Sequence, residues 1–297
     1  MKVAFLGLGV MGFPMAGHLA AAGFDVTVFN RSSAKADAWR SAHGGAAHSD
    51  PAVAAADCDV VLMCLGDDPD VAAVMDRILP SLKEGAVVVD HTTASPALAR
   101  RLHADLGRVG VGFVDAPVSG GEAGARNGKL AIMCGGEISA IATARAATAP
   151  YTGRFVHVGP PGHGQLCKSV NQICIAGVLQ GLAEGVHFAL AAGLDVEKTL
   201  EAISGGAAQS WQMENRARTM AAGEFDFGFA VDWMRKDLRI ALEEARQIGA
   251  RLPVASLVDQ FYADVQAMGG GRNDTSSLIQ RLAVPANNGA ANAKKLS

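Results

Sequence analysis

The stretch KVAFLGLGVMGFPMAGHL, residues 2–19, joins an apolar run to a glycine-rich turn and then to a helical pattern. Its three glycines, Gly7, Gly9 and Gly12, match G-x-G-x-x-G between a strand and a helix. There the first glycine permits a tight turn, the second admits a pyrophosphate to the backbone, and the third lets helix and strand pack closely. A purely structural turn is the alternative, but a second apolar run follows and favours dinucleotide binding. We expect the cofactor loop to comprise Gly7, Leu8, Gly9, Val10, Met11 and Gly12.

Apolar runs alternate with alanine-rich helical stretches from this loop to about residue 160. Nearly every residue in the runs is apolar, without alternation, as in strands that crossover helices bury on both faces. The pattern predicts an α/β domain with a doubly wound parallel sheet. Its strands are expected at 2–7, 25–30, 59–65, 86–91, 112–117, 130–136 and 154–159.

Prolines and glycines punctuate VGPPGHG, residues 158–164, and the strand-like runs end there. We expect a cofactor-binding domain at 1–161, an all-α domain at 162–285, and a disordered polar tail at 286–297. One long helix over 163–193 is expected to join the two domains. The further helices are expected at 195–203, 209–222, 231–249, 253–268 and 275–283, with an aromatic loop at 222–232.

The composition narrows the class of protein. The chain has 297 residues, 49% of them hydrophobic, which suffices for two cores of ordinary domain size. A net charge of −3 with scattered Lys and Arg offers no basic surface for nucleic acid. Five cysteines without C-x-x-C spacing indicate reduced thiols. With no recognisable signal peptide, membrane-spanning run or metal-ligand spacing, we expect a cytoplasmic protein without nucleic-acid, membrane or metal partners.

The end of the second apolar run bears on the choice of cofactor. It reads FNRSS, residues 29–33, where NAD-binding proteins place a carboxylate for the ribose hydroxyls. Asn30, Arg31 and Ser32 carry no carboxylate, and Arg31 can pair with a 2′-phosphate. The sequence therefore favours NADP(H), with NAD(H) possible, whereas an arginine that is simply solvated is the alternative.

Four separated blocks resemble the β-hydroxyacid dehydrogenase family, which includes 3-hydroxyisobutyrate dehydrogenase and the tartronate, glyoxylate and succinic semialdehyde reductases. The blocks are GLGVMGFPMAGHL (7–19), DAPVSGGEAGARNGKLAIMCGG (115–136), GHGQLCKSVNQ (162–172) and RKDLRIALEEA (235–245). The resemblance covers residue 2 to about 285, and His18 departs from the asparagine common in the family's first helix. It implies a Rossmann domain, a long connecting helix, an all-α C-terminal domain that makes subunit contacts, and a homodimer or homotetramer.

Lys168 is the candidate catalytic residue. Partial burial at the start of the long helix would lower the pKa of its ammonium toward neutrality, so that it exchanges a proton with the substrate hydroxyl. A lysine that snorkels to solvent is the alternative, but Lys168 matches the catalytic lysine of the resembling family. Asn171 shares its helix face and is expected to hold the substrate oxygen, with hydrogen bonding inside the domain seam as the alternative. Gln172 is a weaker candidate.

Ser119, Gly120 and Gly121 form a turn whose amide donors are open to a carboxylate. On sequence alone such a turn is more often structural, but the resemblance implies that it holds a small, carboxylate-bearing substrate. The resemblance also places Lys236 near the cofactor or substrate and Asp237 in a supporting contact, although adjacent opposite charges usually form a solvated surface.

The remaining cofactor candidates follow the third and fourth long apolar runs. The resemblance implies that Leu65 and Thr93 line the nicotinamide ribose, with Gly66 where the family commonly has proline.

These observations predict an NAD(P)-dependent oxidoreductase that interconverts a short 3-hydroxy acid and its semialdehyde or keto form. An imine reductase of the same architecture is the enzymatic alternative, but such enzymes usually replace the lysine. A non-catalytic NADP-binding interaction module is the alternative from another class. A 6-phosphogluconate dehydrogenase would need a larger C-terminal domain and cationic phosphate contacts.

Overall fold

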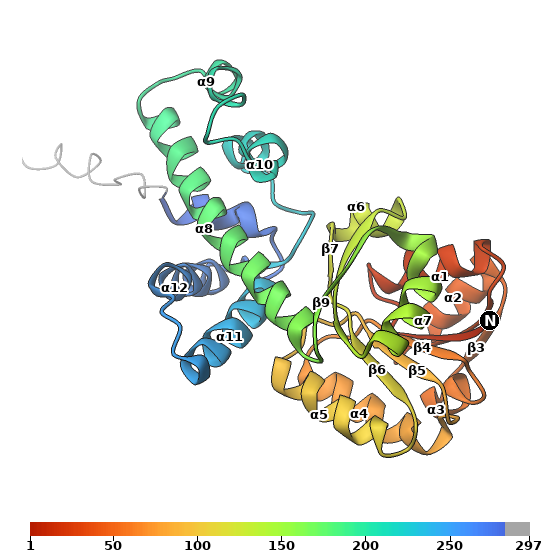
Figure 1. The fold of residues 1–297 in the computed structure, drawn as a ribbon. Coiled ribbons are helices and arrows are strands. Elements are labelled where there is room, and N and C mark those ends of the chain that lie inside the picture. The colour runs from red at the N-terminus through yellow and green to blue at the C-terminus, as the bar shows by residue number, and fades with distance from the viewer. Residues whose placement is uncertain (283–297) are drawn as a thin grey trace, which may run out of the picture. The chain divides into compact units, whose positions relative to one another are not determined.

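The computed structural model describes residues 1–282, which form two compact units (Figure 1). Unit 1 comprises residues 1–171 together with 240–250, and unit 2 comprises residues 172–239 together with the described residues from 251 on. This division falls inside the long helix, so a domain boundary between 161 and 162 stays a prediction. The expected tail 286–297, and the ends of the expected ranges 162–285 and 275–283, lie outside the described residues.

Unit 1 is built on a nine-stranded sheet in the order β3-β2-β1-β4-β5-β6-β8-β7, with β9 paired to β8. Strands β1 to β6 are parallel, as the apolar runs predicted. Their carboxyl ends therefore lie along one edge of the sheet, where ligands of doubly wound folds bind. The strands are β1 (Lys2–Leu6), β2 (Asp25–Phe29), β3 (Ala46–His48), β4 (Val60–Met63), β5 (Val87–Asp90), β6 (Gly112–Asp115), β7 (Val118–Ser119), β8 (Leu130–Gly136) and β9 (Thr152–Gly159).

The far edge of the sheet corrects the expectation of an all-parallel arrangement. Strand β8 pairs antiparallel with both β6 and β7 and parallel with β9. Between β6 and β8 the chain forms only β7 and the six-residue helix α6 (Gly121–Arg126). A helix of this length spans about 9 Å and is too short for the crossover that parallel neighbours need. Strands β3 and β7, with three and two residues, were too short for the apolar pattern to reveal.

Helices cover both faces of the sheet (Figure 1). One core cluster joins α1 (Gly12–Ala21), α2 (Ser33–His43) and α7 (Ile138–Thr148) to alternate residues of β1, including Val3 and Phe5. The other joins α3 (Pro51–Ala55), α4 (Asp68–Ile78) and α5 (Pro96–Gly107) to Ala4 and Leu6 of the same strand. Burial on both faces is the physical reason that these strands lack a polar alternation.

The second half of the chain is helical, as predicted. Helix α8 (His163–Ala191) stops two residues before the expected end, because Gly193 takes the left-handed conformation (φ +70°) that terminates helices. The last expected helix is a 3₁₀ segment. The remaining elements are α9 (Val196–Ile203), α10 (Trp211–Ala222), α11 (Val231–Ile248), α12 (Pro253–Ala267) and the 3₁₀ helices η1 (Leu79–Ser81), η2 (Ala149–Tyr151) and η3 (Thr275–Leu282).

Helix α8 is long and apolar enough to cross a membrane by length and composition alone, with a mean hydropathy of 1.6. The core helix of a soluble protein passes the same criterion. Two buried polar side chains of α8, Gln165 and Lys168, hydrogen-bond to backbone groups of the sheet domain. These bonds attach the N-terminal part of α8 to the sheet domain.

Candidate functional site

The glycine loop after β1 has the geometry that its sequence pattern requires. Gly7 has φ +102°, and a Cβ there would clash with the carbonyl oxygen of Cys64. A Cβ on Gly12 would clash with the Gly7 carbonyl oxygen, so α1 packs against the turn without room for a side chain. Nothing lies within 4 Å of a Cβ on Gly9, which is exposed. The loop therefore leaves open space at its second glycine, the position where a pyrophosphate approaches the backbone.

The end of β2 supports this loop. The amide of Leu8 donates to Asn30 Oδ1 at 2.9 Å, and Asn30 Nδ2 donates to the Ser32 carbonyl at 3.1 Å. Arg31 extends into solvent, 92% exposed, with Asp70 3.6 Å away. An ion pair this exposed holds the guanidinium weakly. Asn30 thus fixes the loop, while Arg31 is a solvent-exposed cation beside it.

The ends of β4 and β5 are hydrogen-bonded to each other. The amide of Leu65 donates to Thr92 Oγ1 at 2.9 Å, and the amide of Thr92 donates to Asp90 Oδ1 at 2.9 Å. Thr93 follows directly and is half-buried. The two candidates Leu65 and Thr93 therefore stand on one connected edge of the sheet, the edge at which the glycine loop also begins.

A buried carboxylate connects β6 to the start of α8. Asp115 Oδ1 accepts from the amide of Gly162 at 2.8 Å, and Oδ2 accepts from the amide of Gln165 at 2.9 Å. Burial raises the pKa of Asp115 to about 7, against the opposing effect of these two N–H donors. Gly164 has no space for a Cβ against the Asp115 carbonyl, so the first turn of α8 lies directly on the strand end.

Lys168 follows on this anchored turn and is 7% exposed. Its Nζ donates to the carbonyl of Val118 at 2.9 Å. Val118 directly precedes Ser119, Gly120 and Gly121, so the structure brings the candidate proton carrier to the candidate carboxylate turn. Gly120 and Gly121 take φ values of +124° and +58°, which only glycine adopts readily. Asn171, half-buried, lies three residues after Lys168 on α8.

Lys236 lies in unit 2, on α11, beside Asp237 and Gln172. Gln172 Nε2 donates to Asp237 Oδ2 at 2.6 Å, and Lys236 Nζ lies 3.1 Å from Asp237 Oδ1. The side chains of Lys236 and Asp237 are only 11% and 1% exposed. The alternative of a solvated surface pair is therefore wrong, because both side chains are largely buried.

Three residues that hold the site together were given no role from sequence: Thr92, Asp115 and Gln165. Asp115 and Gln165 stand inside quoted family blocks, and Gln165 is a polar residue one turn before Lys168 on an otherwise apolar helix. The position of Gln165 one turn before Lys168 is the sequence feature that could have indicated its role. The backbone partners of Asp115 and Gln165 are distant in sequence, however, and only the fold reveals them.

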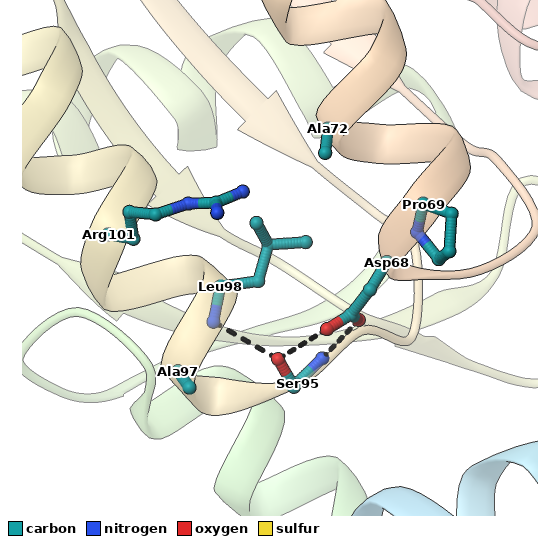
Figure 2. A pocket seen from close by; sticks show the side chains of 7 residues that line it. All are labelled: Asp68, Pro69, Ala72, Ser95, Ala97, Leu98 and Arg101. Carbon is teal, nitrogen blue, oxygen red and sulfur yellow. Dashed lines mark hydrogen bonds between the residues drawn. The ribbon is translucent and has the colours of Figure 1, made fainter.

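A shallow depression of about 420 Å³ lies between the starts of α4 and α5 (Figure 2). Asp68 accepts there from the amide and hydroxyl of Ser95, at 2.7 and 2.5 Å. Arg101 and Leu98 reach into it from α5, as Figure 2 shows. None of the candidate site residues lines this depression. Among residues 1–282, no three His, Cys, Asp or Glu side chains gather as a metal site.

Comparisons with known proteins bear on this geometry. Residues 2–159 match the model for the NAD binding domain of 6-phosphogluconate dehydrogenase, and residues 162–282 match that for the NAD-binding region of NADP-dependent 3-hydroxyisobutyrate dehydrogenase. An uncharacterized oxidoreductase of Shewanella frigidimarina is 57% identical over 284 residues, covering 95% of this chain and 98% of the relative. A probable 3-hydroxyisobutyrate dehydrogenase-like protein of Arabidopsis thaliana is 39% identical, covering 95% and 85%.

The solved structure of Mycobacterium tuberculosis 3-hydroxyisobutyrate dehydrogenase with L-serine superposes with a TM-score of 0.88 at 31% identity, over 95% of this chain and 99% of that one. The chain belongs to the β-hydroxyacid dehydrogenase family. As a β-hydroxyacid dehydrogenase it is an NAD(P)-dependent oxidoreductase that acts on the CH–OH group of a hydroxy acid. The open Gly9 position and the Asn30-supported loop fit the nicotinamide cofactor of the family.

Proposed function

We propose that this β-hydroxyacid dehydrogenase interconverts a short 3-hydroxy acid and its semialdehyde or keto form, with NADP(H) as the preferred cofactor and Lys168 as general acid and base. The observation that carries the proposal is the 2.9 Å hydrogen bond from Lys168 Nζ to the carbonyl of Val118. It holds a buried amine next to a glycine turn that suits a carboxylate. A substrate with both a hydroxyl and a carboxylate can engage the two together.

Each side chain has a defined part in the proposed reaction. The nicotinamide, when bound, donates or accepts the hydride. Lys168 gives a proton to the forming alkoxide in reduction and takes it from the hydroxyl in oxidation. The backbone amides of Gly120 and Gly121 and the Ser119 hydroxyl bind the carboxylate. Asn171, one turn along α8, donates to the substrate oxygen and keeps it in reach of the amine.

The cofactor preference rests on the end of β2. Arg31 is 92% exposed and is held only by a solvated ion pair, so turning it toward a 2′-phosphate costs little. Ser32 adds a hydroxyl beside it, and the matched model for residues 162–282 describes an NADP-dependent enzyme. Leu65, Thr93 and Lys236 are proposed to contact the same cofactor. Equal catalytic efficiency with NAD(H) and NADP(H) would contradict the phosphate-binding role of Arg31.

Two other functions remain as alternatives to test. An imine reductase of this fold would not need the buried amine that Lys168 supplies. A non-catalytic NADP-binding module would keep the glycine loop but show no turnover. The buried, backbone-anchored position of Lys168 favours the dehydrogenase over both.

Replacement of Lys168 tests the catalytic assignment. We expect Lys168→Met to lower kcat by about 100-fold or more, the usual contribution of a general acid-base, while NADPH still binds, as followed by its fluorescence. Lys198→Met, at an exposed position on α9, serves as the control and should keep full activity. Wild-type turnover in Lys168→Met would remove Lys168 from the mechanism.

A substrate panel tests the reaction itself. Glyoxylate, succinic semialdehyde, tartronate semialdehyde, methylmalonate semialdehyde, 3-hydroxyisobutyrate and serine, each assayed with both cofactors by nicotinamide absorbance, cover the proposed class. A cyclic imine is assayed alongside them. Activity confined to the imine would favour the imine reductase, and no turnover on any compound would favour the binding module.

The enzyme is further proposed to be a cytoplasmic homodimer or homotetramer without nucleic-acid or membrane partners. Five free thiols support a reducing compartment. Helix α8 offers a subunit surface, because Val178 and Phe188 are 42% and 70% exposed on one of its faces. Nothing lies within 4 Å of a Cβ on Gly177, Gly181 or Gly185, so a second helix could approach closely.

A further inference from the structure

The buried side chain of Gln165 hydrogen-bonds to both sides of one turn. Its side-chain Nε2 donates to the Thr92 carbonyl at 2.7 Å, and its Oε1 accepts from the Ala94 amide at 3.1 Å. The two partners flank Thr93, so one carboxamide holds the whole turn after β5. Gln165 is 1% exposed, and water cannot replace these bonds.

The same residue is fixed on its helix side. Its backbone amide donates to Asp115, and its carbonyl accepts from Ser169 Oγ at 3.1 Å. The turn after β5 is also bonded to the end of β4, because Thr92 Oγ1 accepts from the Leu65 amide. Lys168 follows three residues later on the anchored helix. A continuous set of hydrogen bonds therefore runs from the β4 and β5 ends to the helix that carries the amine.

We propose that Gln165 is a positioning residue, which sets the distance between the Thr93 turn on the nicotinamide side and Lys168 on the proton side. The inference rests on the proposed function, since it assumes that Thr93 contacts the cofactor and Lys168 moves the proton. The hydride is transferred at the carbon, and the proton at the oxygen, of one C–O group of the substrate. The nicotinamide side and the lysine side must therefore keep a fixed distance from each other. A displacement of about 1 Å costs on the order of 100-fold in such reactions.

The chemistry of the two partners explains why the residue is an amide. The Thr92 carbonyl needs a hydrogen-bond donor from this side chain, while the Ala94 amide needs an acceptor. Glutamine supplies both on one planar group, whereas an ionised glutamate supplies acceptors only. A protonated glutamate again has one O–H donor and one acceptor oxygen, and so reproduces the amide pattern.

Three variants test the proposal: Gln165→Leu, Gln165→Glu, and the control Thr148→Val, which removes a buried hydroxyl that donates to a carbonyl of its own helix, α7, away from these bonds. In Gln165→Leu we expect kcat to fall about 10- to 100-fold, while the NADPH dissociation constant changes less than about threefold. A larger deuterium isotope effect on kcat with 4-deuterated NADPH should accompany the loss, because hydride transfer becomes more rate-limiting. Thr148→Val should keep the wild-type isotope effect.

The glutamate variant separates positioning from loss of fold. The kcat of Gln165→Glu relative to wild type should rise as the pH falls, because the buried carboxyl gains its donor on protonation, and circular dichroism should show the same fold throughout. Wild-type kcat and isotope effect in Gln165→Leu would overturn the proposal. So would a flat relative kcat of Gln165→Glu between pH 8 and pH 5.

The outcomes also distinguish this proposal from the proposed function. Full turnover in Lys168→Met removes the catalytic assignment, whatever Gln165 does. Loss of turnover in Lys168→Met, together with an unchanged Gln165→Leu, leaves the function standing and removes the positioning role.

Discussion

Gly9 and Gly12 lie three residues apart in one loop and have opposite surroundings. A Cβ on Gly9 meets nothing within 4 Å, whereas one on Gly12 meets the Gly7 carbonyl oxygen and the Phe5 ring. The two glycines therefore serve different ends, since one leaves room for a ligand and the other lets a helix pack on a strand.

Alanine substitutions should separate these roles. Gly9→Ala should leave the unfolding free energy within about 0.5 kcal/mol of wild type but weaken NADPH binding at least about tenfold, because the methyl group occupies the pyrophosphate space. Gly12→Ala should lower the unfolding free energy by about 1–3 kcal/mol through overpacking. Urea denaturation and NADPH fluorescence titration measure the two quantities. Equal stability losses in both variants would contradict the assignment.

His91 is a buried neutral histidine under the sheet edge. Its Nδ1–H donates to the Ala116 carbonyl at 2.7 Å, and its Nε2 accepts from the Tyr151 hydroxyl at 2.9 Å. Burial lowers the pKa of His91 from 6.5 to about 4. The unfolded chain therefore protonates His91 near pH 6.5, whereas the folded chain does so only near pH 4. The free energy of unfolding consequently decreases as the pH falls from about 6.5 to about 4.

His91→Asn tests this dependence, because asparagine does not titrate. At pH 7.5 the wild type should be the more stable protein, and its advantage should shrink by about 2 kcal/mol at pH 5. Asp115, whose raised pKa has the opposite effect on stability, is common to both proteins and cancels in the difference. Urea unfolding at pH 7.5 and pH 5 measures the difference in unfolding free energy between the two proteins. An advantage that does not change with pH would mean that burial does not lower the pKa of His91 in the folded protein.

At the scale of elements, single side chains connect the starts of helices. Ser95 Oγ accepts from the Leu98 amide at 3.0 Å and so caps α5, while its hydroxyl donates to Asp68 on α4 (Figure 2). A capping side chain satisfies an amide that the helix itself leaves without a partner. Asp115, at the end of β6, caps α8 in the same way, because it accepts from the amides of Gly162 and Gln165. The edge of the sheet that carries the site is therefore held by side-chain bonds between neighbouring elements.

Ser95→Ala should lower the unfolding free energy by about 1–2 kcal/mol, because it removes a cap and one of the two donors to Asp68. Ser256→Ala is the matched control: its exposed hydroxyl donates to the carbonyl of Leu252, the residue just before its own helix, and its loss should cost little. Thermal unfolding by calorimetry compares the two. A control that loses as much stability as Ser95→Ala would contradict the capping role.

At the scale of the whole molecule, the outward face of α8 predicts self-association. Phe188→Asp should shift the assembly to a smaller species in light scattering coupled to gel filtration, because a charge on the proposed subunit surface must be desolvated. Val53→Asp is the control, since Val53 is also exposed, at 53%, but lies on α3 in unit 1. Unchanged mass in Phe188→Asp would exclude α8 from the interface.

The sequence alone predicted the doubly wound sheet, the helical second half and the cofactor loop, because these depend on local patterns. Apolar runs without alternation mark buried parallel strands, and three spaced glycines mark the turn between β1 and α1. Even where boundaries shifted, as at Gly193, the shift was two residues. The family blocks also singled out Lys168 and the Ser119–Gly121 turn as candidates, and their roles stay predictions.

Only the tertiary structure decided which strands run antiparallel and which polar groups meet. The antiparallel pairing of β8 with β6 follows from a connection too short to cross the sheet, and β7 is too short to leave a pattern. The bonds of Gln165 to the Thr92 turn join residues more than 70 positions apart. Local sequence encodes propensity and periodicity, whereas such bonds exist only once the folded chain brings their donors and acceptors out of water together.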